Sequence, residues 1–125
     1  MSTHERPVNL DLTKFAFPLP ALASITHRIT GVILFVGIAF MLYALDLSLS
    51  SASGFAEAQA LMDTLPGKFV TWGLLTAVAY HLLAGVKHLL LDWDLGDTLE
   101  GARLGAQLVV AGSVVLSVLA GVWVW

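Results

Sequence analysis

The chain has 125 residues, of which 58% are hydrophobic and only 12% are charged, and its net charge is −3. Soluble domains carry about 25% charged residues, so this composition predicts an integral membrane protein. The sequence contains no cysteine, which excludes disulfides and cysteine-ligated metals in this chain. It also has no basic patch of the kind that nucleic-acid binding requires.

The chain begins with a polar segment, residues 1–20, which is interrupted by prolines. This segment, which we expect to be cytoplasmic, lacks the apolar core of a cleavable signal, so the first membrane helix would act as its own insertion signal and stay in the mature protein. An uncharged run from Ile29 to Leu45 follows it, behind a more polar lead-in. The two together predict a first membrane helix over about residues 21–47, long enough to cross a core of about 30 Å.

Residues 46–68 predict a connection that contains one short interfacial helix. We expect Pro66-Gly67 to end this helix, because such a pair favours a turn. The apolar face of the helix would consist of Phe55, Leu61, Met62 and Leu65.

Two further apolar stretches predict membrane helices over about residues 68–92 and 103–125. Residues 21–125 therefore predict an all-α domain of three transmembrane helices. Several polar groups would point inward from these helices, so we expect them to pack with a partner membrane subunit into a larger bundle. The loop between the second and third helices is acidic and contains Asp92, Asp94, Asp97 and Glu100.

The distribution of lysine and arginine predicts the orientation. With three spans, the N-terminus shares a side with the loop after the second span, and the positive-inside rule places that side in the cytoplasm. The C-terminus is then periplasmic, on the side that holds only Lys68. The cytoplasmic side carries Arg6, Lys14, Arg28, Lys87 and Arg103.

Four residues near the start of the first membrane helix have offsets that place them on one helical face. They are Ser24, His27, Arg28 and Gly31. Arg28 either reaches toward lipid headgroups or holds a carboxylate or phosphate group. The Ser24 hydroxyl is a suitable donor to a carbonyl oxygen.

The second membrane helix carries His81, Gly85 and His88 on one face. An imidazole near the middle of the bilayer needs a partner, and His81 has two interpretations: an interhelical hydrogen bond or axial ligation of haem iron. Gly85 would let a flat ligand approach the backbone. We expect His88, near the helix end, to pair with Asp92 rather than to bind iron.

The sequence resembles the cytochrome b556 subunit of bacterial succinate dehydrogenase over nearly its whole length. The resemblance rests on three motifs, namely Arg6-Pro7-Val8-Asn9-Leu10, Ser24-Ile25-Thr26-His27-Arg28-Ile29-Thr30-Gly31, and His81-Leu82-Leu83-Ala84-Gly85-Val86-Lys87-His88 with Asp92. Lys87 departs from the family, which often has arginine there, and lysine lacks the planar guanidinium fork.

The resemblance implies a membrane anchor that passes electrons from succinate oxidation to ubiquinone. His81 would be the haem b axial ligand, His27 and Arg28 would lie near the haem propionates, and Ser24 and Arg28 would lie at the quinone site. The partners would be a second small membrane subunit supplying the other haem ligand, an iron–sulfur subunit and a flavoprotein. The isolated chain would not be an enzyme but would share the quinone-reducing site of the complex in the bacterial inner membrane.

Two other functions compete with this one. The chain is alternatively a structural membrane anchor without haem, or a small transporter or proton conduit. The conduit would use His27, His81 and His88 as a relay, but the last membrane helix offers few polar residues to line a path. The conduit therefore ranks last.

Overall fold

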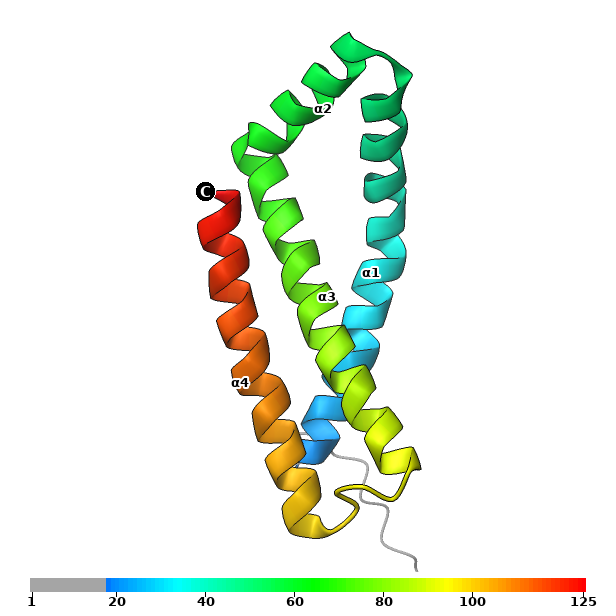
Figure 1. Cartoon of the computed structure of the whole chain (residues 1–125), viewed down its shortest axis with the longest axis vertical. Coiled ribbons are helices and arrows are strands. Elements are labelled where there is room, and N and C mark those ends of the chain that lie inside the picture. Colours follow the sequence, from blue (N-terminus) through cyan, green and yellow to red (C-terminus); the bar gives the residue numbers. More distant parts are fainter. Residues whose placement is uncertain (1–17) are drawn as a thin grey trace, which may run out of the picture.

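The computed structural model describes residues 18–125, so most of the N-terminal segment predicted over residues 1–20, with its Arg6–Leu10 motif, lies outside the described residues. The described part folds into four helices (Figure 1). These are α1 (Leu19–Ser50), α2 (Ala52–Asp63), α3 (Leu65–Asp92) and α4 (Leu99–Val124).

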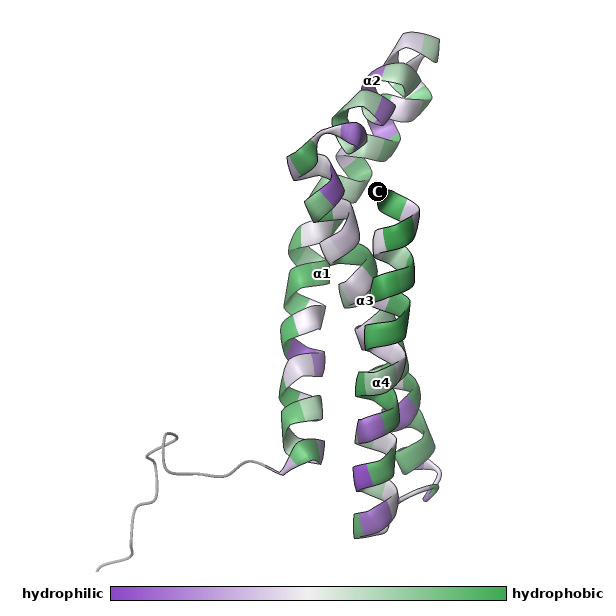
Figure 2. Ribbon diagram, turned by 90° about the vertical axis from the view of Figure 1, so that its left-hand side faces the viewer, coloured by the Kyte–Doolittle hydropathy of each residue, from purple (hydrophilic) through white to green (hydrophobic). Residues whose placement is uncertain are grey.

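Within residues 18–125, the helices α1, α3 and α4 are long and apolar enough to cross a membrane, which confirms the predicted all-α fold with three spans. Figure 2 shows hydrophobic residues along most of their length. The α1 helix includes Asp46 and continues three residues past its predicted end at about residue 47, to Ser50. A single carboxylate at a membrane boundary does not stop a helix when neither proline nor glycine follows it.

The expected short helix is present as α2, but its predicted end at Pro66-Gly67 is wrong. The α2 helix ends at Asp63, and Pro66 lies in the first turn of α3. The Gly67 N–H donates to the Thr64 hydroxyl at 3.1 Å, which caps α3. Proline is tolerated in a first turn because its missing N–H would have no helical partner there. The pair therefore starts one helix instead of ending another.

The α3 helix lies between α1 and α4 and contacts both of them. The α1 and α3 helices run antiparallel, and α2 joins them as an arch at one end of the molecule (Figure 1). A tight loop with Gly96 at φ +73° joins α3 to α4 at the opposite end. This arrangement brings the N-terminal part of α1 against the middle of α3.

Small side chains make up the helix contacts. The described part of the chain has no large side chain that is fully buried, whereas large aliphatic and aromatic side chains point outward along all three spans. Small residues allow membrane helices to approach closely, since lipid gives little hydrophobic drive for their association. The buried positions are Ala23, Gly37, Ala44, Gly54, Ala58, Gly67, Ala77, Ala84, Ala106, Val109 and Ser113.

Polar contacts join α3 to α4 near the C-terminal end of α4. The Trp72 indole Nε1–H donates to the Ser117 carbonyl at 2.9 Å. The hydroxyls of Thr76 and Ser117 lie 2.8 Å apart and share a hydrogen bond. These contacts fix the register of the two helices in a region that is otherwise apolar.

Candidate functional site

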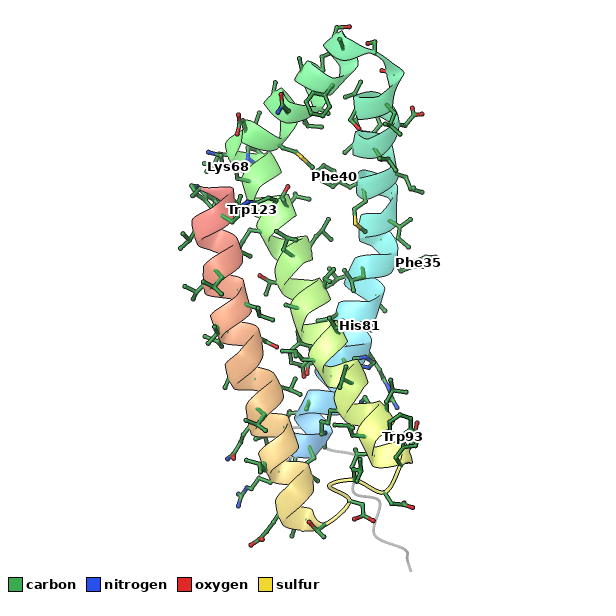
Figure 3. All side chains as sticks on the ribbon, in the orientation of Figure 1. Phe35, Phe40, Lys68, His81, Trp93 and Trp123 are labelled. Carbon is green, nitrogen blue, oxygen red and sulfur yellow. The ribbon has the colours of Figure 1, made fainter. Side chains whose placement is uncertain are left out.

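His81 lies near the middle of α3, where α1 crosses it (Figure 3). Its Nδ1 atom is 3.2 Å from the His27 carbonyl oxygen and 3.2 Å from the Thr30 hydroxyl oxygen. A carbonyl oxygen only accepts hydrogen bonds, so the contact with His27 places the proton on Nδ1. The lone pair of Nε2 is then free to bind another group, as in histidine ligands whose second nitrogen is oriented by a hydrogen bond.

The imidazole of His27 stacks on that of His81. The ring centroids are 4.1 Å apart, and the planes differ by 10°. His81 lies over Gly31 of α1, because a Cβ at Gly31 would be 3.2 Å from His81 Cε1. His27 lies over Gly85 of α3 in the same way, because a Cβ at Gly85 would be 3.7 Å from His27 Nε2. Each histidine therefore packs on a glycine of the opposite helix, and the flat group that the structure places over Gly85 is the His27 ring.

His88 faces α1, and its predicted pairing with Asp92 is wrong. The His88 ring is 5.1 Å from that of His27 at a tilt of 55°. No hydrogen bond or ion pair joins His88 to Asp92, which is exposed at the end of α3. The half-buried His88 ring instead packs toward His27, and the exposed carboxylate stays at the surface, where an isolated pairing gains little.

Ser24 and Arg28 lie on the first turns of α1, outside the histidine cluster. Ser24 is half-buried and Arg28 is exposed. Within residues 18–125, no hydrogen bond connects either side chain to His27, His81 or His88. The structure therefore brings His27 and His81 together and leaves the serine and the arginine at the surface of this chain.

Thr30, three residues after His27 in the motif, also belongs to the site, although its residue type and position predicted no role for it. The Thr30 hydroxyl donates to the His27 carbonyl at 2.9 Å and also contacts His81 Nδ1. The Tyr80 hydroxyl of α3 donates to the Ala23 carbonyl at 2.9 Å and also forms a hydrogen bond with the Thr26 hydroxyl. These contacts attach α1 to α3 around the histidine cluster.

The donor set restricts what His81 can bind. Within the described residues, no group of three or more histidine or carboxylate side chains is placed to hold a bare metal ion. A single imidazole with a free Nε2 suits a metal that brings its own equatorial ligands, as the iron of a porphyrin does. The site thus fits haem better than a metal held by protein ligands alone.

Three apolar helices, with a hydrogen-bonded histidine where α1 and α3 cross, define a class of membrane protein whose intramembrane histidine is the candidate functional group. Comparison with known sequences specifies the member of that class. The chain belongs to the succinate dehydrogenase/fumarate reductase transmembrane subunit family, whose sequence profile matches residues 2–120. The resemblance stated from the motifs is therefore confirmed.

Several relatives are similar over most of their length. The succinate dehydrogenase cytochrome b556 subunit of Coxiella burnetii is 42% identical over 97% of this chain and 98% of its own length. The subunit of the same name from Paracoccus denitrificans is 39% identical over 91% of this chain and 88% of its own length. The mitochondrial cytochrome b560 subunit of Mus musculus is 36% identical over 94% of this chain and 69% of its own length.

Proposed function

We propose that this chain binds haem b through Nε2 of His81 and contributes to the ubiquinone-reducing site of succinate dehydrogenase. The observation that carries the proposal is the contact of His81 Nδ1 with the His27 carbonyl, at 3.2 Å. This contact favours the tautomer in which the Nε2 lone pair is free to act as a ligand. The cytochrome b556 names of the relatives support the same cofactor. Bound haem supplies one-electron redox chemistry, and the protein supplies ligand, orientation and polarity.

His27 and Arg28 are the residues that we assign to the haem propionates. The His27 ring stacks on His81 and is therefore close to any porphyrin that His81 holds. Arg28 is the next residue along α1, and its exposed guanidinium can bind a carboxylate through two parallel hydrogen bonds. A paired carboxylate is much cheaper to place at a membrane boundary than an isolated one.

Ser24 and Arg28 are the residues that we assign to the quinone. They lie one helical turn apart at the N-terminal end of α1, where neither is engaged by the histidine cluster. The Ser24 hydroxyl would donate to a quinone oxygen and orient the ring. The Arg28 guanidinium would stabilise negative charge on the quinone oxygens as electrons arrive.

Partner subunits complete the site in this proposal. The second axial ligand would come from a second small membrane subunit, and the outward-facing apolar side chains of the three spans are suited to packing with it. An iron–sulfur subunit and a flavoprotein subunit would bind at the end that carries Ser24. That end, with the N-terminus, would face the cytoplasm of a bacterium, and the C-terminus would face the periplasm.

A reduced-minus-oxidised absorbance spectrum of the purified complex tests the haem assignment. We expect His81→Leu to abolish the b-type signal, because it removes the only group that we assign to the iron from this chain. His88→Gln is the matched control, since it alters the same cluster without touching the ligand. A His81→Leu complex that assembles, keeps its haem bands and still reduces quinone would show that this chain does not ligate the haem iron, and it would contradict the proposal.

A further inference from the structure

An apolar groove lies between α3 and α4 at the end of the bundle that carries the α3–α4 loop. Its volume is about 410 Å³. It follows both helices for about eight residues, which is about 12 Å of helix length. The lining is aliphatic apart from one lysine and consists of Leu83, Val86, Lys87, Leu90, Leu91, Leu95, Gly96, Gly101, Ala102, Leu104, Gly105, Leu108 and Val109.

Lys87 is the one charged residue in this lining. Its methylene stem lies across Gly105 of α4, with Cγ, Cδ and Cε at 3.5–3.7 Å from the position that a Cβ would take. Among residues 18–125, no ion pair joins the Lys87 ammonium to a carboxylate. Lys87 lies five residues before the end of α3, a distance of about 8 Å, so its ammonium can reach the level of lipid headgroups.

Negative charge lies at the loop end of the same groove. Leu95 and Gly96 line the groove, and the exposed Asp94 and Asp97 flank these two residues in the sequence. The positive φ angles of Asp94 and Gly96, 58° and 73°, belong to the tight turn that places this loop beside α4. The loop end of the groove therefore has two acidic residues beside its lining in the sequence, and Lys87 lies within the lining.

We infer that this groove binds a phospholipid whose headgroup carries a primary ammonium, of the phosphatidylethanolamine type. An acyl chain would lie along the aliphatic lining, and the phosphate would accept hydrogen bonds from Lys87. The lipid ammonium would then donate to Asp94 and Asp97. This site is separate from the histidine cluster and does not depend on the proposed haem.

The charges of the loop select this headgroup over two common alternatives. An anionic phosphatidylglycerol would meet Lys87 favourably, but the two aspartates would repel it. A phosphatidylcholine has a quaternary ammonium without N–H donors, so it cannot form hydrogen bonds to the carboxylates. The groove between α1, α2 and α3, of about 480 Å³, has no charged residue in its lining and offers no comparable selectivity.

Native mass spectrometry of the delipidated complex, purified with its partner subunits, tests the inference. The complex is titrated with the three lipids, all with the same acyl chains. We expect phosphatidylethanolamine to bind best, and Lys87→Gln to weaken its binding about fivefold, as for the loss of one lysine contact with a headgroup. Lys87→Arg keeps the charge and should retain binding. Lys68→Gln removes a lysine from the opposite end of the same chain and should change nothing.

Two further variants test the two halves of the site. Asp94→Asn combined with Asp97→Asn should remove the preference for phosphatidylethanolamine over the other two lipids. Ala102→Phe, which fills the apolar groove, should weaken all three lipids. Equal binding of the three lipids by the unaltered complex would overturn the inference, as would a preference for phosphatidylglycerol. Unchanged phosphatidylethanolamine binding in both Lys87→Gln and Ala102→Phe would also overturn it.

Discussion

The side chain of His81 is held on three sides by α1. The His27 ring covers one of its faces, the His27 carbonyl and the Thr30 hydroxyl contact Nδ1, and the Gly31 backbone lies against Cε1. A ring packed in this way loses little conformational freedom when it binds a further group. Helix packing already orders the His81 side chain before any group binds to it.

The contact between His81 and Gly31 leads to a prediction about side-chain volume. Gly31→Val adds atoms where a Cβ alone would already be 3.2 Å from His81 Cε1. We expect the ring to be displaced at a cost of about 1–3 kcal/mol and the haem content of the purified complex to fall. The measurement is the ratio of haem absorbance to protein.

Gly73→Val is the matched control for this substitution. Among residues 18–125, a Cβ at Gly73 would meet no neighbouring atom within 4 Å, so the same change of residue should leave the haem content unaltered. Equal haem content in both variants would mean that the Gly31 contact does not position His81.

At the residue level, the sequence predicted which side chains matter better than it predicted their contacts. Helical offsets placed His27 on a polar face of one helix and His81 on a polar face of another. They could not show that each ring packs on a glycine four residues beyond the other histidine, because this requires the crossing point and direction of two helices. Thr30 was missed for the same reason, and the assigned roles of Ser24 and Arg28 remain predictions, since they depend on partner atoms.

At the element level, α3 is the helix that organises the bundle. It contributes His81 toward α1, and it contributes Trp72 and Thr76 toward α4. The presence of the long helices followed directly from the lengths of the apolar runs in the sequence. The residues at which the helices end did not. The Thr64 cap and the proline in the first turn of α3 are local hydrogen-bonding details that hydropathy does not reveal.

The hydroxyl pair between Thr76 and Ser117 allows a prediction about α3–α4 association. A double-mutant cycle with Thr76→Val and Ser117→Ala isolates the energy of this pair. We expect a coupling of about 0.6 kcal/mol, the average for such bonds between membrane helices. The measurement is the midpoint of SDS-driven unfolding of the purified complex. Strictly additive effects of the two substitutions would show that this hydrogen bond contributes nothing to the packing.

At the scale of the whole molecule, the chain has apolar faces that it does not bury itself. The alanine-rich contacts join the three spans, and the large side chains are left for lipid or for other subunits. Other subunits were predicted from the sequence, and membership of a family of succinate dehydrogenase membrane subunits implies them. The partner's contact surface could not be predicted, since it depends on residues of another chain.

The orientation of the chain is testable because its sequence contains no cysteine. Single cysteines at Ser53, in α2, and at Asp97, in the α3–α4 loop, report on opposite ends of the bundle. In intact spheroplasts, a membrane-impermeant maleimide should label Ser53→Cys and leave Asp97→Cys unlabelled until the membrane is permeabilised. The reverse labelling pattern would invert the proposed orientation and move the quinone site to the periplasmic side.

The most direct test of the central claim is a cryo-electron microscopy map of the assembled complex at a resolution that shows side chains. The proposal predicts haem iron bonded to Nε2 of His81, with Nδ1 still directed at the His27 carbonyl and a ligand from a second membrane subunit on the opposite face of the porphyrin. A map in which both His81 nitrogens contact only protein atoms, with no porphyrin beside the ring, would contradict it.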